Sequence, residues 1–133
     1  MEYASFNKLL CENNAKAEGV GNVCFGYGDA THLDFRDESF DAVVSNYVYH
    51  NIRGDRQALL LETLRVLKKG GTFIIHDIFS KFRYGDMSSF VCKLKRMGYE
   101  DVRLIDTTDG TFITKREAGW LALSRSALLT GRK

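Results

Sequence analysis

The sequence predicts an α/β fold built on a mainly parallel sheet whose final strand runs antiparallel. Short apolar runs that suit buried strands alternate with stretches whose apolar residues recur every three or four positions, as in helices. The last two predicted strands are joined by an irregular stretch, which allows them to pair antiparallel. With 133 residues, 44% of them hydrophobic, the chain fits a single domain over residues 1–133.

The first part of the chain predicts one helix and two strands. We expect a helix over residues 5–17, with Ser5 as N-cap and Gly19 as its stop. Residues 23–25 form a short apolar run that predicts a strand. A polar loop then leads to residues 40–45, whose nearly unbroken apolar run is typical of a parallel strand covered on both faces.

The second part alternates helices and strands. A helix is expected from residue 54 to 68, ended by Gly70 and Gly71, because its leucines recur at helical spacing. The further predictions are a strand over 72–76, a helix over 87–97, a strand over 102–105, a short helix over 117–123 and a last strand over 126–131. The rest of the stretch from 110 to 120 fits no regular element.

Composition excludes several classes of function. The net charge is only +2, which gives no electrostatic case for binding nucleic acid or a membrane surface. No apolar run is long enough to cross a bilayer. Three scattered cysteines and three histidines show no metal-ligand spacing, so we expect reduced thiols, no metal site and a cytoplasmic location.

Polar and aromatic residues gather just past the predicted strands, where ligands bind in open α/β sheets. Gly28, Asp29 and Ala30 follow the first strand. Asn46, Tyr47, Tyr49, His50 and Asn51 follow the second, and Asp77 follows the third.

The ordered set of these segments resembles the class I S-adenosylmethionine-dependent methyltransferases. The resemblance rests on Gly-Asp-Ala at 28–30, Leu-Asp-Phe at 33–35, Ser-Phe-Asp-Ala-Val-Val-Ser at 39–45 and Leu-Arg-Val-Leu-Lys-Lys-Gly-Gly at 64–71. It implies a Rossmann-like fold, S-adenosylmethionine as cofactor and a small-molecule methyl acceptor. By the same resemblance the cofactor contacts are Gly28, Asp29 and Ala30 at the adenine, and Asn46 and Tyr47 at the methionine end.

His50 lies in the loop on the acceptor side and is the candidate catalytic base, because imidazole can take up a proton near neutral pH. Structural alternatives remain open. Asp29 could simply stabilise a turn, His50 could be a loop hydrogen-bonding residue, and Asp77 could only terminate its strand.

The N-terminal strands and glycine-rich loop of the full seven-stranded fold have no counterpart in this sequence. Gly19 and Gly21 precede a predicted strand instead of following one, so they do not form that loop. The sheet is therefore expected to be incomplete, and two of its strands would face a gap. The chain would then pair these strands directly, form a homodimer or bind a partner chain that completes the sheet, or be a fragment of a longer protein. The function is then either that of a methyltransferase or that of an inactive, methyltransferase-like interaction module.

Overall fold

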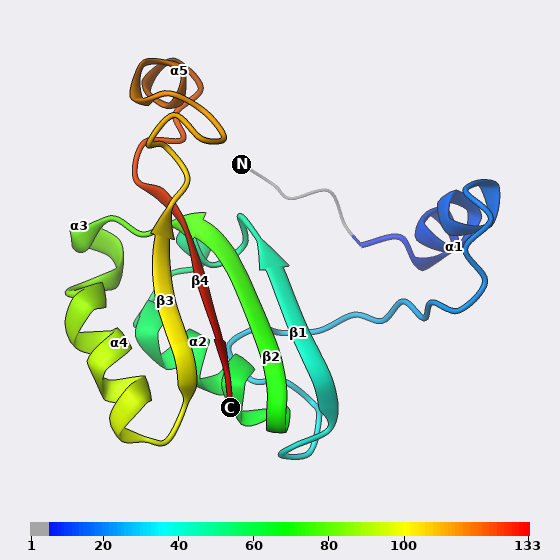
Figure 1. The fold of residues 1–133 in the computed structure, drawn as a ribbon. Helices are drawn as coiled ribbons and strands as arrows, with labels where there is room; N and C mark the ends of the chain where they lie inside the picture. The colour runs from blue at the N-terminus through cyan, green and yellow to red at the C-terminus, as the bar shows by residue number, and fades with distance from the viewer. Residues whose placement is uncertain (1–5) are drawn as a thin grey trace.

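The structure, a computed structural model, describes residues 6–133 (Figure 1). Its elements are, in order, α1 (Lys8–Ala17), β1 (Phe40–Asn46), the 3₁₀ helix η1 (Tyr49–Asn51), α2 (Arg56–Arg65), β2 (Leu67–Ile78), α3 (Lys81–Tyr84), α4 (Met87–Arg96), β3 (Glu100–Asp106), α5 (Lys115–Trp120) and β4 (Ser126–Arg132).

The strands form a four-stranded sheet in the order β1-β2-β4-β3. β1 and β2 are parallel, whereas β4 pairs antiparallel with both β2 and β3. β3 therefore runs in the same direction as β1 and β2, and only the final strand is reversed. The predicted α/β, Rossmann-like class and the antiparallel last strand are confirmed, as is the incompleteness of the sheet relative to the full fold.

One face of the sheet carries the hydrophobic core. Helices α2 and α4 pack on this face (Figure 1), and their leucines meet Phe73 and Ile75 of β2 and Leu129 of β4. Phe73, Ile75 and Leu129 are completely buried. Because side chains alternate along a strand, the residues between them point to the opposite face.

That opposite face is covered by no helix of the described chain. Val44 of β1 is 77% exposed and Ile74 of β2 is 42% exposed, although both are apolar and lie side by side in the sheet. Helix α1 stands away from the sheet (Figure 1) and buries none of its residues. β1 pairs only with β2, so within residues 6–133 its other edge has no neighbouring strand.

The predicted strand over residues 23–25 is wrong. This segment is extended but pairs with nothing in the described chain. A strand is stable only when a neighbour takes up its backbone hydrogen bonds, and the apolar run alone could not reveal that none is present. The idea that this segment pairs directly with β1 is contradicted as well.

Most other boundaries agree with the sequence to within a few residues. Ser5, the expected N-cap of the first helix, lies outside the described residues, and the side chain of Asn7 caps α1 instead. α2 ends at Arg65, and Gly70 and Gly71 belong to β2 instead of ending the helix. A Cβ on Gly71 would lie 2.9 Å from the carbonyl oxygen of Asp41, so glycine allows the start of β2 to approach β1 closely.

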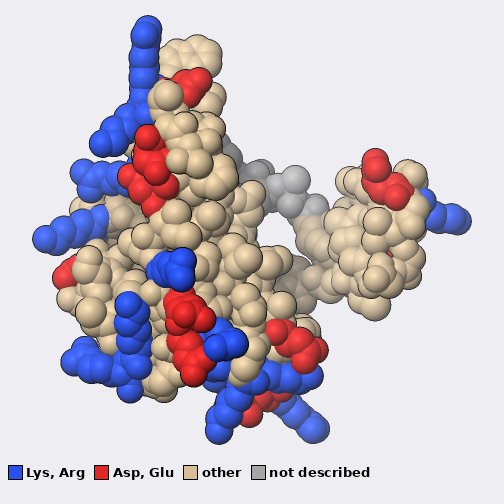
Figure 2. Space-filling model, viewed as in Figure 1, with Lys and Arg blue, Asp and Glu red and all other residues tan. Residues whose placement is uncertain are grey.

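The face seen in Figure 2 shows no large patch of charge of one sign. Acidic and basic side chains are interspersed on this face. None of the helices in the described part of the chain combines the length and the apolar character needed to cross a membrane.

Candidate functional site

The carboxyl ends of β1, β2 and β3 meet at one edge of the sheet because the three strands run in the same direction. Asn46 ends β1, His76 and Asp77 lie near the end of β2, and Thr107 follows β3. The reversed strand β4 begins at the same edge with Ser126. The register confirms this arrangement, since Asn46 pairs with His76, and Asp77 with Ala127.

A buried carboxylate holds His50 at this edge. The Asp77 carboxylate is completely buried, and its Oδ1 accepts from His50 Nδ1 at 2.6 Å. Its Oδ2 accepts from the backbone N–H groups of Tyr49 at 2.8 Å and His50 at 3.2 Å. These donors compensate the cost of burying the charge. Because Nδ1 carries its proton toward Asp77, the second ring nitrogen, Nε2, is the proton acceptor of the neutral imidazole.

A second imidazole, His76, lies between the ends of β1 and β3. Its Nδ1 lies 3.0 Å from Asn46 Oδ1, and its Nε2 lies 3.1 Å from Thr107 Oγ1. Burial lowers the pKa of His76, although the negative charge of Asp77 acts in the opposite direction. Burial therefore favours the neutral ring, which lies within hydrogen-bond distance of the Asn46 amide and orients it.

Tyr47 covers this second imidazole. It adopts a left-handed backbone conformation with φ of 52° just after β1, which is uncommon for a residue other than glycine. Its ring lies 4.5 Å from the His76 ring, centre to centre, and its hydroxyl donates to Ser126 Oγ at 3.0 Å. The strain is offset by these contacts, and strained backbone often marks functional sites.

Tyr47 and His76 line one side of a pocket of about 280 Å³. The remaining lining residues are Thr107, Phe112, Ile113, Leu123 and Leu128. Most of these residues follow β3 or precede β4. The stretch around residues 110–120, to which the sequence assigned no regular element, therefore forms one wall of the pocket. Tyr49, by contrast, points into the core, where its hydroxyl lies 2.6 Å from Thr63 Oγ1.

Gly28, Asp29 and Ala30 lie in the segment before β1. Oδ1 of Asp29 accepts from the backbone N–H and the hydroxyl of Thr31, at 2.8 and 2.7 Å, and these bonds lower its pKa. Ala30 is half-buried against the core. No hydrogen bond or ion pair in residues 6–133 joins Asp29 to the carboxyl edge, so its contact with adenine stays a prediction.

The structure thus brings Asn46, Tyr47 and His50 together at one edge. The sequence pointed to Asp77 by its place after a strand but not to its bond with His50. His76, Thr107 and Ser126 were missed. His76 lies inside an apolar strand. The only signal for it in the sequence is its position one residue before the polar end of that strand.

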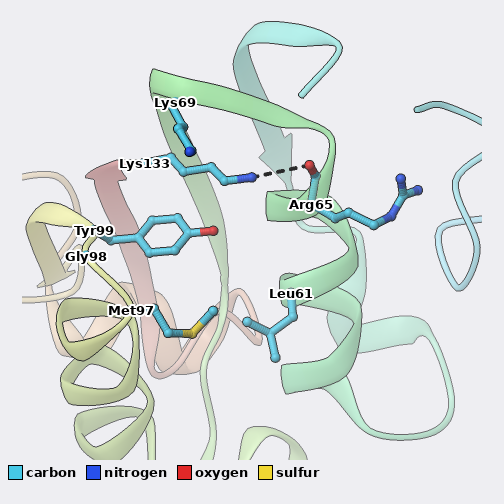
Figure 3. Close-up of a pocket in the computed structure, with 7 residues that line it drawn as sticks. All are labelled: Leu61, Arg65, Lys69, Met97, Gly98, Tyr99 and Lys133. Atoms are coloured by element: carbon cyan, nitrogen blue, oxygen red, sulfur yellow. Dashed lines mark hydrogen bonds between the residues drawn. The ribbon is translucent and has the colours of Figure 1, made fainter. Parts of the chain in front are cut away.

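A larger pocket, of about 540 Å³, lies near the other end of the sheet (Figure 3). Leu61, Met97 and Tyr99 give it an apolar lining. The guanidinium of Arg65 points away from it, and Lys133 Nζ donates to the carbonyl oxygens of Leu64 and Arg65 at the end of α2. None of the predicted site residues contributes to this pocket.

The sequence matches the family described as "Methyltransferase domain" over residues 5–75, just over half of the chain. A demethylmenaquinone methyltransferase of Geobacillus kaustophilus is 42% identical over 112 residues, which cover 83% of this chain and 44% of the relative. An arsenite methyltransferase of Aquipseudomonas alcaligenes is 37% identical over 76 residues, which cover 55% of this chain and 22% of the relative. The chain therefore spans less than half the length of these two relatives.

Among solved structures, the cyclase SpnF superimposes with a TM-score of 0.66 at 20% identity, covering 95% of this chain and 62% of that protein. At this identity the likeness concerns the fold alone. The fold of the chain, its sequence match to the family and the order of its motifs are consistent with one another. The chain belongs to the class I S-adenosylmethionine-dependent methyltransferases.

Proposed function

We propose that this chain forms the adenine edge and the acceptor side of a methyltransferase that transfers a methyl group from S-adenosylmethionine to a small molecule. The observation that carries the proposal is the bond of 2.6 Å between His50 Nδ1 and the buried carboxylate of Asp77 at the carboxyl edge. An imidazole held by a buried carboxylate is a typical arrangement for a general base.

The residues of this chain fit part of a cofactor site. Both hydrogen bonds from Thr31 go to Oδ1 of Asp29, which leaves the exposed Oδ2 able to accept from an adenine amino group. Asn46 and Tyr47 would line the methionine end. The glycine-rich turn that would hold the rest of the cofactor has no counterpart in the sequence, so these contacts are a partial set.

When bound, S-adenosylmethionine supplies an already activated methyl group, so the protein mainly has to align the reactants. Tyr47 and the apolar wall of the pocket would exclude water and position the acceptor. His50 would accept the proton that the nucleophilic atom of the acceptor loses, through its Nε2. Asp77 would hold the ring and stabilise the imidazolium that forms.

Calorimetric titration with S-adenosylmethionine into the millimolar range tests the proposal. We expect saturable binding that Asp29→Asn weakens by about tenfold, the size of one hydrogen bond to a charged acceptor. Asp34→Asn is the matched control, because it removes the same charge from an exposed residue five positions away. It should leave the affinity unchanged.

Two outcomes would contradict the proposal. The absence of both heat and a thermal shift up to millimolar cofactor would favour the inactive interaction module for this chain. Equal losses in the two variants would mean that Asp29 contributes only general charge and does not contact the adenine.

A further inference from the structure

Two arginine side chains converge on a single carbonyl oxygen beside the candidate base. Arg83 Nη1, from α3, donates to the backbone oxygen of His50 at 2.5 Å. Arg56 Nη2, from the start of α2, donates to the same oxygen at 3.3 Å. Arg56 Nη1 also donates to the backbone oxygen of Arg83 at 3.3 Å. Two positive charges are therefore held side by side at the backbone carbonyl of His50.

Neither guanidinium has a carboxylate partner in the described part of the chain. Within residues 6–133, no carboxylate oxygen lies within 4.0 Å of a nitrogen of Arg56 or Arg83, whereas Arg65 pairs with both Glu62 and Asp37. Asp77, the nearby buried acid, accepts hydrogen bonds from His50 and Tyr49 instead. Adjacent cations repel each other, and an anion placed between them would remove that cost.

One further polar atom of these two side chains lacks a partner. Arg56 Nε is buried and makes no hydrogen bond within the described chain. Arg83 itself is exposed, so its guanidinium is accessible to a ligand. A purely structural role for these arginines would be to hold η1 against α2 and α3. One cation on the His50 carbonyl is enough for that role. Arg56 alone already bonds to the backbone oxygens of both His50 and Arg83.

We propose that the acceptor carries an anionic group, a carboxylate or a phosphate, which binds to Arg83 and Arg56 next to His50. The planar guanidinium matches two oxygens of either group with a pair of hydrogen bonds. This inference rests on the proposed function, because it takes the surroundings of His50 as the acceptor side of the site.

The test is a titration of the ¹⁵N-labelled chain with inorganic phosphate and, in a separate series, with benzoate, at constant ionic strength set with sodium chloride. We expect saturable shifts of the His50 amide and of the arginine Nε–H signals. The series with the tighter binding identifies the class of anion. Arg83→Gln should weaken that binding by about threefold to tenfold, since it removes one charge-assisted pair of hydrogen bonds.

Lys81→Gln is the matched control, because it removes one positive charge from the same short helix and should leave the affinity unchanged. Arg83→Lys keeps the charge but not the planar pair of donors, so its affinity should fall between those of the wild type and Arg83→Gln. A thermal melt of each variant checks that the fold is kept.

The inference is overturned if neither anion shifts the His50 amide, or if Lys81→Gln weakens binding as much as Arg83→Gln. A parallel titration of the same samples with S-adenosylmethionine separates the two proposals. Cofactor binding without anion binding would leave the proposed function standing and remove the anionic acceptor. Anion binding without cofactor binding would contradict the proposed function. It would show an anion site at Arg83 and Arg56 but remove its interpretation as the acceptor side of a methyltransferase.

Discussion

Asp77 connects the stability of the fold to the chemistry of the candidate site. It is completely buried, and its side chain accepts from the backbone N–H groups of Tyr49 and His50, from the His50 ring and from the N–H of Ile78. Asp77→Asn keeps the shape of the side chain but removes the charge and turns one acceptor into a donor that faces N–H groups. We expect a loss of about 2 kcal/mol in the free energy of unfolding, typical of disrupting a buried hydrogen bond to a charged group.

Urea denaturation measures this loss. The exposed Asp34→Asn variant, with the same chemical change, should stay within about 0.5 kcal/mol of the wild type. If Asp77→Asn were equally neutral, Asp77 would only mark the end of its strand, and the proposed role of His50 as a base would lose its support.

For individual residues, the sequence predicts position in the fold but not hydrogen-bond partners. The position of Asn46, Tyr47 and His50 after an apolar strand predicted that they share an edge, because the carboxyl ends of parallel strands meet there. The sequence could not predict which of these polar groups bond to one another. The left-handed turn at Tyr47 and the bond between His50 and Asp77 depend on backbone directions that only the folded chain sets.

At the scale of elements, helix α2 fastens the loop that leads into β1. Arg65 donates to both carboxylate oxygens of Glu62 and to the carbonyl oxygens of Leu33 and Phe35. Its hydrogen bonds lower the pKa of Glu62 from 4.5 to about 2. The ionised form of Glu62 is therefore favoured in the folded state.

This shift predicts how stability depends on pH. A depressed folded-state pKa contributes stability that is fully present above pH 4.5 and is lost as the pH falls toward 2. Glu62→Gln should lower stability by about 1 kcal/mol at pH 7, because the pair is partly exposed, and should flatten the acid limb of the stability curve. Glu12→Gln, which removes an exposed ion pair of 3.6 Å with Lys8, should leave that limb unchanged.

The sequence predicted some helices and strands more accurately than others. Helix α4 and strands β3 and β4 follow from periodicity and agree with the structure within a few residues. The strand expected at 23–25 does not form, because strand formation depends on a partner and not only on an apolar run. The end of α2 was placed too late because the pair Gly70 and Gly71 reads as a helix stop, whereas Gly71 instead allows close contact with β1.

At the scale of the whole molecule, β1 has no neighbouring strand on its outer edge within residues 6–133, and no described helix covers one face of the sheet. Val44 lies in this edge strand and is 77% exposed, and edges of this kind pair readily with other chains. We expect the chain to self-associate as its concentration rises, as measured by light scattering after size exclusion. Val44→Lys should shift it toward the monomer, because a charge on an edge strand opposes pairing.

Phe82→Lys is the control, since Phe82 is 99% exposed on α3 and the change has the same character away from the sheet. It should leave self-association unchanged. A wild-type chain that stays monomeric at all concentrations and melts cooperatively would eliminate the homodimer.

We propose that the carboxyl edge of this sheet is the acceptor and cofactor side of a methyltransferase. The most direct measurement is a map of backbone amide shifts as S-adenosylmethionine is added to the ¹⁵N-labelled chain. We expect saturable shifts at Gly28, Asp29 and Ala30 and at Asn46 and Tyr47. Shifts confined to the pocket around Leu61, Met97 and Tyr99, or no shifts at millimolar cofactor, would contradict it.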